Sequence, residues 1–311
     1  MIVYIKLLLT ALLWGGTFIA GRVVAGDVGP FSAAFFRFLI ASIFLVIFTC
    51  RMEGKLPLPG KRHMIPVFLL GMTGVFLYNV FFFKGLKLIH AGRASIIIAG
   101  NPILITLFSA YFFKEKLNLI KGVGIIISVV GAVIVISKGS VGEIVNGGIG
   151  WGEIFIFICV LSWVAYSLIG KAVMNGLSPL ASVTYSSVIG TVMLFFPGLF
   201  EGMFNDFRSY PPMAWWSIFY LGFFGTVIGF VWYYEGIKKI GAMRAGLFIN
   251  FVPICAVVLA FFMLDEPITL SLLIGTVLVC SGVYLTNKRF PPDTVESTVK
   301  TDVIVNRETM V

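Results

Sequence analysis

The sequence predicts an all-helical membrane protein, with ten transmembrane helices arranged as two inverted five-helix repeats. Of its 311 residues, 59% are hydrophobic and only 12% are charged, whereas a soluble domain carries about 25% charged residues. The apolar residues fall into runs of about 20, the length that an α-helix needs to cross a bilayer. In addition, the second half of the chain repeats the first at an offset of 149 to 151 residues.

The first half holds five apolar runs. The expected helices are residues 3–24, 31–49, 65–87, 92–112 and 119–137. The segments between these runs contain residues that interrupt a membrane helix. Residues 26–30 contain two glycines and a proline, residues 51–63 are basic and contain two prolines, and residues 114–116 are charged. We therefore expect a first five-helix repeat at residues 1–138.

The second half shows the same organisation. The expected helices are residues 151–171, 179–199, 213–236, 242–263 and 268–286. A glycine-rich stretch at 139–150 is expected to link the halves, and the second repeat is expected at 151–290. Residues 291–311 are polar and have no apolar period, so we expect a disordered cytoplasmic tail.

The repeat is visible in matched residues along both halves. The pairs include Trp14 and Trp163, Gly21 and Gly170, Gly74 and Gly225, Pro102 and Pro253, and Glu115 and Glu266. Because each half would hold an odd number of spans, the two halves would sit in opposite orientations. Inverted repeats of this kind are typical of alternating-access transporters.

The distribution of basic residues predicts the orientation in the membrane. With the N-terminus inside, the inner segments hold a clear excess of Lys and Arg, as cytoplasmic segments do. We therefore expect a multi-pass protein of the plasma (inner) membrane with both termini in the cytoplasm. The connection that carries Lys84, Lys87 and Arg93 disagrees, because it is too basic for an outer loop.

Several classes of function are disfavoured by the sequence. The net charge of +9 is explained by membrane orientation, so no nucleic-acid partner is expected. The four cysteines form no close pair or metal-binding pattern, and no motif of a metalloprotease, a serine hydrolase or a P-loop occurs. We expect no enzyme activity, no cofactor and no metal; the expected partners are the lipid bilayer and a small-molecule substrate, and the sequence is compatible with a homodimer.

The chain resembles the EamA family of the drug/metabolite transporter superfamily over about residues 4–287. The segments that carry the resemblance are 13–18 (LWGGTF), 36–41 (FRFLIA), 91–102, 113–117 (FKEKL), 242–253 and 264–267 (LDEP). The resemblance implies a ten-helix fold and the export or exchange of small metabolites. The substrates it implies include amino acids and related compounds, sugar-linked nucleotides and drugs.

Two prolines mark expected helix kinks near the middle of the membrane. Pro102 and Pro253 each remove a backbone donor and free the carbonyl four residues earlier, and such carbonyls belong at a cavity or a helix contact. Asn101 and Asn250 lie close to the two prolines. We expect these residues at a substrate site, with a structural kink as the alternative.

Aromatic residues in the middle of two other spans suggest a cavity wall. Trp14 and Thr17 share one face of the first helix, and their repeat mates Trp163 and Tyr166 share one face of the sixth. An interfacial anchor is not needed at mid-span, so a substrate-binding wall is expected. Plain helix packing remains the alternative.

The remaining candidates are polar or charged side chains within spans. Tyr78 and Asn79 fall midway along the third helix, and Arg37 is either a ligand for a substrate carboxylate or a brace for backbone carbonyls. Arg22 is expected to snorkel to the interface. Residues 232–234 (WYY) are expected to belong to an interfacial aromatic belt.

Transport of small organic solutes is the function that these patterns favour. Amino acids or related compounds are the expected substrates, moved by export or facilitated exchange. No carboxylate lies in the middle of a predicted span, which weakens proton coupling and selection of aromatic cations. The alternatives are a lipid-carrier flippase and a broad-specificity drug exporter.

Overall fold

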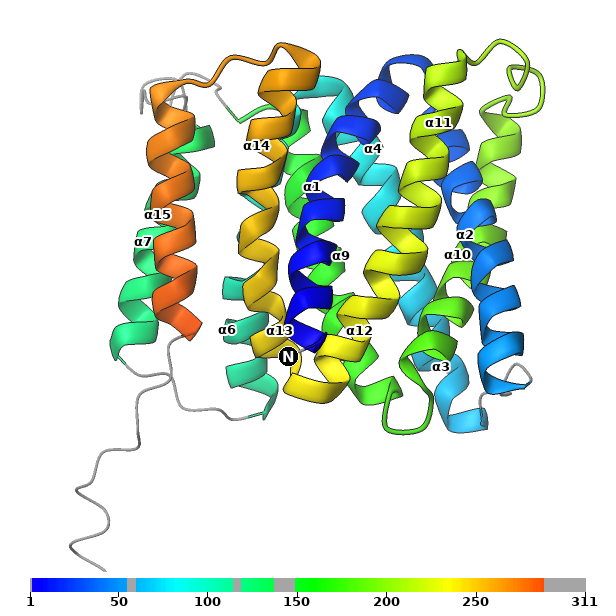
Figure 1. The fold of residues 1–311 in the computed structure, drawn as a ribbon, viewed down its shortest axis with the longest axis horizontal. Coiled ribbons are helices and arrows are strands. Elements are labelled where there is room, and N and C mark those ends of the chain that lie inside the picture. The colour runs from blue at the N-terminus through cyan, green and yellow to red at the C-terminus, as the bar shows by residue number, and fades with distance from the viewer. Residues whose placement is uncertain (1, 55–59, 114–118, 137–148, 288–311) are drawn as a thin grey trace, which may run out of the picture.

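A computed structural model describes residues 2–54, 60–113, 119–136 and 149–287, and every regular element in those ranges is helical (Figure 1). The elements of the first half are α1 (Ile2–Asp27), α2 (Pro30–Glu53), α3 (Lys61–Leu70), η1 (Gly71–Leu77), α4 (Tyr78–Leu88), α5 (Ala91–Ile98), α6 (Asn101–Phe113) and α7 (Leu119–Ile136). Those of the second half are α9 (Trp151–Val173), α10 (Pro179–Phe200), α11 (Pro212–Tyr220), η2 (Leu221–Ile228), α12 (Gly229–Ile240), α13 (Ala242–Gly246), η3 (Leu247–Asn250), α14 (Phe251–Leu264) and α15 (Leu270–Asn287). The expected tail and nearly all of the expected linker lie outside the described residues.

Length and composition fit a membrane protein. Among the described residues, six helices are long and apolar enough to cross a bilayer. They are Ile2–Asp27, Pro30–Glu53, Arg62–Leu88, Trp151–Val173, Pro179–Phe200 and Pro212–Ile240. Shorter apolar helices lie at Ala91–Ile105, Gly122–Gly131, Phe251–Leu264 and Leu270–Gly282. An all-helical membrane protein is therefore confirmed, whereas ten spans in two inverted repeats stay a prediction.

The helix ends follow from local chemistry. Proline occupies the first helical position of α2, α10 and α11, where its missing N–H and fixed φ cost nothing. Ser178 caps α10 by accepting a hydrogen bond from the peptide N–H of Ala181 at 3.0 Å. Gly54 ends α2 with a φ of 75°, a left-handed conformation that favours glycine.

The third apolar run of each half changes its winding at the same place. It passes through π-helical turns at Gly71–Leu77 and at Leu221–Ile228, which are repeat mates. A π-turn leaves backbone carbonyls free for side chains and often marks a functional position. The side chains of Asn79 and Thr226 use such carbonyls, as described below.

The helices at the two prolines are also irregular. α5 ends at Ile98 and α6 begins at Asn101, directly before Pro102, and the peptide N–H of Gly100 donates to the carbonyl of Ile97 only three residues back (3.0 Å). In the second half the 3₁₀ turn η3 precedes α14, and Pro253 is the third residue of α14. Both interruptions lie where the backbone loses a donor.

Glycines allow close contacts between the two halves, and these contacts occur in pairs related by the sequence repeat. Each of these glycines lies against a side chain of the other half, and each contact has a repeat counterpart. The pairs are Gly71 with Ile189 and Gly222 with Ile40, Gly74 with Tyr166 and Gly225 with Thr17, and Gly85 with Ile156 and Gly236 with Leu7. The matched contacts bring the two halves into the same kind of interface twice.

The last helices of the halves, α7 and α15, pack on each other at one side of the molecule (Figure 1). Glycines allow their backbones to approach closely, since a Cβ at Gly131 would lie 2.9 Å from the carbonyl oxygen of Gly275, and one at Gly282 would meet that of Gly124. Small residues at such contacts are typical of helix pairs in membranes. The core that positions the candidate site lies in the other helices.

Candidate functional site

A small cavity lies at the interface between the halves, and we call it the central cavity. Its volume is ≈ 30 Å³, enough for about one water molecule, whereas pockets for organic ligands measure about 300–1,000 Å³. The residues that line it come from both halves: Trp14, Thr17, Phe18, Arg37, Tyr78, Phe82, Ile98 and Asn101 from the first, and Trp163, Phe230, Ile249 and Val252 from the second. In this conformation the cavity has no room for an organic solute.

Half of the residues that line the central cavity are aromatic. The repeat mates Trp14 and Trp163 meet edge to face, with ring centroids 5.2 Å apart and an interplanar angle of 88°. Phe230 and Tyr78 pack on Trp163 with centroid distances of 5.1 and 5.4 Å. The indole N–H of Trp14 donates to the carbonyl of Gly225 in the π-turn η2 at 2.9 Å. The two tryptophans are therefore held at the middle of the interface.

Polar side chains also line the central cavity. Arg37 is 3% exposed, and it donates from Nη1 to Oδ1 of Asn79 (2.8 Å) and from Nε to Oγ1 of Thr226 (3.1 Å). Asn101 is 1% exposed, and its Oδ1 has no hydrogen-bond partner among the described residues. The cavity thus combines apolar surface with one cation and one open acceptor.

Most of the residues expected at a substrate site come together here. Trp14, Thr17, Arg37, Tyr78, Asn101 and Trp163 line the cavity. Asn79 lies behind Arg37 as its partner. The side chains of Pro102 and Asn250 lie outside the described residues, so their expected roles stay predictions.

Tyr166 is displaced from the cavity lining. Its ring packs against Gly74 in the π-turn η1, and its hydroxyl lies 3.2 Å from that of Ser186. Ser186 is the repeat mate of Arg37, and Tyr166 is that of Thr17. The two halves therefore place different chemistry at equivalent positions, with the cation on one side only.

Sequence reasoning missed several residues of the cavity and its support. Phe82 follows Tyr78 by one helical turn and so shares its face, a signal that could have identified it. Thr226, in η2, is a polar residue near the middle of the expected helix 213–236, which is a signal that could have identified it. Phe230, in α12, is one of many phenylalanines in apolar runs, so its sequence position carries no such signal. Their positions depend on how the second half docks on the first.

The expected aromatic belt at residues 232–234 is wrong for two of its members. Tyr233 and Tyr234 are 1% and 0% exposed. Tyr233 packs on Trp14 with ring centroids 5.2 Å apart, and the hydroxyl of Tyr234 donates to the carbonyl of Tyr166 (3.2 Å). Tyr234 turns toward the core because Gly170 on the facing helix leaves room for its ring.

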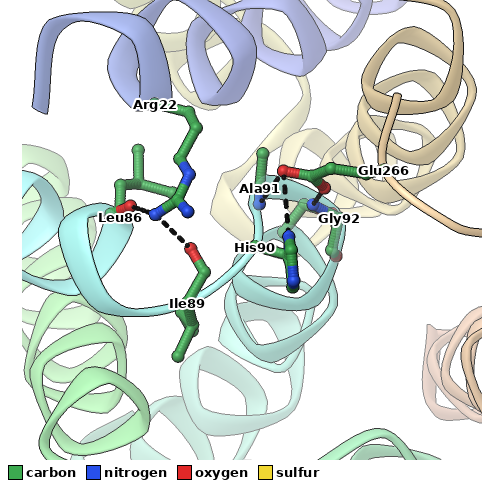
Figure 2. A network of polar contacts seen from close by, with 8 residues as sticks. Arg22, Leu86, Ile89, His90, Ala91, Gly92 and Glu266 are labelled. Atoms are coloured by element: carbon green, nitrogen blue, oxygen red, sulfur yellow. Dashed lines mark hydrogen bonds and ion pairs between the residues drawn. The ribbon is translucent and has the colours of Figure 1, made fainter. Parts of the chain in front are cut away.

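The end of the molecule opposite the N-terminus carries a network of backbone caps, shown in Figure 2. Arg22 donates to the carbonyls of Leu86 and Ile89 (3.2 Å for Ile89), so it caps the C-terminal turn of α4. Its expected snorkelling to the membrane interface stays a prediction. Glu266, from the second half, accepts from the peptide N–H groups of Ala91 and Gly92 at 2.9 and 3.1 Å.

Further polar contacts join the halves at both ends, and we call the set the cross-half contacts. At the end opposite the N-terminus they are Glu266 with Ala91 and Gly92, Glu201 with Ser32, and Arg93 with Glu153. At the N-terminal end they are Lys6 with Glu235 and Glu53 with Ser178. The Arg93–Glu153 pair, 2.9 Å long and largely buried, accounts for one of the basic residues that did not fit an outer loop.

A larger cavity of ≈ 240 Å³ lies beside Glu266. It is bounded by the start of α5, the end of α14, the following connection and the start of α15. Its buried charged groups, Arg93 and Glu266, are already engaged in cross-half contacts. The central cavity is therefore the better candidate for the functional site.

Comparison with known proteins decides the family. The sequence profile of the EamA-like transporter family matches residues 1–137 and 150–288. The chain belongs to this family. As an EamA-like transporter it shares its fold and general function with membrane proteins that move solutes, and the sequence resemblance is confirmed.

Individual relatives cover nearly the whole chain. An uncharacterized transporter of Bacillus subtilis, YyaM, is 31% identical over 90% of this chain and 92% of its own length. A probable terminal-alkyne amino-acid exporter of Streptantibioticus cattleyicolor is 28% identical over 91% of this chain and 92% of its own. A crystal structure with 20% identity superposes with a TM-score of 0.65 over 91% of this chain and 96% of that one. This EamA-like chain therefore shares its fold with a solved structure.

Proposed function

We propose that this EamA-like transporter exports or exchanges small organic solutes, with amino acids or related compounds as substrates. It would work by alternating access between two inverted five-helix repeats in the plasma membrane, with both termini in the cytoplasm. The solute would bind in the central cavity. The observation that carries the proposal is the cavity itself, because both halves build it.

The small volume of the cavity supports a mechanism in which the two halves move. An amino acid does not fit in ≈ 30 Å³, so a substrate enters only when the halves separate on one side. Movement of one half against the other about a fixed central site is the mechanism of transporters built from inverted repeats.

The direction of the helices supports the inverted arrangement. Arg22, near the end of α1, and Gly152, at the start of α9, both contact Ile89 after the end of α4. The first helix of one half thus ends where the first helix of the other begins, so the two run in opposite directions. The matched glycine contacts described above agree with a two-fold relation between the halves.

The cross-half contacts support gates at both ends. At each end, side chains of one half hold groups of the other, and these contacts must break for that end to open. Those opposite the N-terminus are the more buried, since the side chains of Arg93 and Glu153 are 12% and 7% exposed, against 31% and 27% for Lys6 and Glu235. The attraction between buried charges is screened less by water and salt than that between exposed charges, so we expect the N-terminal end to open more readily.

Two observations support amino acids as the substrates: the name of one relative and the residues that line the central cavity. The probable terminal-alkyne amino-acid exporter aligns over nearly its full length. The cavity offers aromatic surface for an apolar side chain beside a guanidinium and an amide oxygen. Both features suit a small solute with one apolar and one polar end.

Transport by the purified protein in sealed vesicles tests the proposal. Uptake and efflux of a panel of radiolabelled amino acids are measured with and without a pH gradient. Trp163→Ala is expected to lower transport at least tenfold, because it removes the ring on which Trp14, Tyr78 and Phe230 pack. Trp216→Ala is the matched control, since Trp216 is 71% exposed and lies outside the cavity.

Asn101→Ala is a second probe of the same site and is expected to impair transport without unfolding the protein. Either cavity variant, if folded by size-exclusion chromatography yet as active as the wild type, would disprove the site assignment. A wild-type protein that moves no member of the panel would disprove the amino-acid proposal.

A further inference from the structure

Arg37 is a buried cation in a span of the membrane domain. It is the eighth residue of α2, which places it about 10 Å along the helix from Pro30 at 1.5 Å per residue. Its side chain and backbone are only 3% exposed. A charge held this deeply in an apolar segment is costly, and such residues are commonly functional.

The partners of Arg37 do not neutralise it. Asn79 and Thr226 both offer neutral oxygens, at 2.8 and 3.1 Å. The carboxylates that make ion pairs or capping bonds among the described residues are used elsewhere: Glu53, Glu153, Glu201, Glu235 and Glu266. In the described part of the chain, Arg37 therefore has hydrogen-bond acceptors but no counter-ion.

The two neutral partners hold the guanidinium in place. The Nδ2 of Asn79 donates to the carbonyls of Gly74 (3.2 Å) and Val75 (2.8 Å), which turns its Oδ1 toward Arg37. The hydroxyl of Thr226 donates to the carbonyl of Leu221 at 3.0 Å and so presents its lone pair to Nε. Both partners are thus anchored to the π-turns, one in each half of the protein.

A guanidinium that is fixed in this way is preorganised for an anion. Arg37 has five N–H donors in a planar fork, of which these two bonds use two. It lines the same cavity as Asn101, whose buried Oδ1 has no partner among the described residues. A cation without a counter-ion and an acceptor without a donor thus face one cavity.

We propose that Arg37 binds a carboxylate of the transported solute, while Asn101 accepts a hydrogen bond from an amino or hydroxyl group of the same solute. The inference rests on the proposed function and narrows it to solutes that carry a carboxylate. Amines and cationic drugs are rejected, because they would place a second positive charge beside Arg37. Arg37 is thereby a specificity-determining residue, and Asn79 and Thr226 are positioning residues.

The competing explanation is that Arg37 only braces α2 against η1, α4 and η2. The two explanations differ in what they predict for matched solutes. A brace affects all solutes alike, whereas a carboxylate ligand distinguishes an amino acid from its amide, which has the same shape and lacks the anion.

The test uses wild-type and variant protein in sealed vesicles, with leucine and leucinamide as probes, both as transported solutes and as competitors against the panel amino acids. The wild type is expected to prefer leucine at least tenfold, equivalent to about 1.4 kcal/mol. Arg37→Gln is expected to abolish this preference while the amide is still transported at the wild-type rate or faster. Arg37→Lys keeps the positive charge but not the planar arrangement of N–H donors, so an intermediate preference for leucine over leucinamide is expected.

Several results would overturn the inference. Equal transport of both probes by the wild type would do so, as would an Arg37→Gln protein that is slower for both but retains the tenfold preference. If Arg37→Gln does not fold, Thr226→Val decides, because it frees one side of the guanidinium: an unchanged preference refutes the assignment. Absence of transport of the whole panel by the wild type counts instead against the proposed function, and this inference falls with it.

Discussion

Removal of the Glu266 carboxylate should destabilise the protein at the end opposite the N-terminus. The side chain of Glu266 caps the start of α5. His90, the residue before that helix, makes no side-chain capping bond of its own. The carboxylate is only 10% exposed. Its loss leaves the N–H groups of Ala91 and Gly92 without their acceptor in a largely buried position.

The magnitude follows from the two bonds. A hydrogen bond to a charged group contributes about 1.5 kcal/mol or more, so two such bonds, at 2.9 and 3.1 Å, give about 3 kcal/mol for Glu266→Ala. Glu266→Gln keeps the volume and one neutral acceptor, worth about 1 kcal/mol, and should cost about 2 kcal/mol. The favourable interaction of a negative charge with a helix N-terminus is also lost in both variants.

The free energy of unfolding of the purified protein in micelles, measured by titration with sodium dodecyl sulphate, checks this order. Asp265→Asn is the matched control, because it removes one negative charge from the exposed neighbour and keeps a residue that tolerates the positive φ of 53°. Its effect should stay below about 0.5 kcal/mol. Glu266→Gln and Asp265→Asn with equal effects would refute the capping argument.

Two further predictions concern packing and orientation. In Gly222→Ala the new Cβ would lie 2.7 Å from the carbonyl oxygen of Arg37, which is backbone and cannot move aside, so the variant should lose about 1–3 kcal/mol of stability in the same titration. Gly26→Ala, with nothing within 4 Å, should be neutral or stabilising, and an equal loss in both would contradict the close approach of η2 to α2. A protein whose remaining cysteine is the exposed Cys50 should react with a membrane-impermeant maleimide in inside-out vesicles and not in intact cells. Labelling in intact cells would place this end of the protein outside and reverse the proposed orientation.

The fold and the site differ in how far the sequence could predict them. Trp14 and Trp163 were identified because the repeat matches them and because a tryptophan at mid-span has no interface to anchor. In the structure the two rings meet edge to face. Tyr166, by contrast, has the same spacing as Thr17 but a larger ring, and it fills the space over Gly74 instead of lining the cavity.

Arg37 shows most clearly where prediction from the sequence ends. The sequence left two roles open for it, a ligand for a substrate carboxylate or a brace for backbone carbonyls. The structure gives it neither a carbonyl nor a carboxylate among its hydrogen-bond partners but the side chains of Asn79 and Thr226. Thr226 is 189 residues away in the chain, and no local pattern relates the two.

The sequence by itself determined that the protein is helical and lies in a membrane, where its helices begin and end, and that its halves are related. These properties are local, because they depend on the length of apolar runs, on prolines and glycines at their ends, and on spacing along one chain. Only the tertiary structure decided which side chains line the cavity, how small that cavity is, and which charges hold the two ends together. Those properties depend on contacts between residues far apart in the chain, and the shape of the facing helix decides whether a ring or a charge turns toward the cavity or away from it.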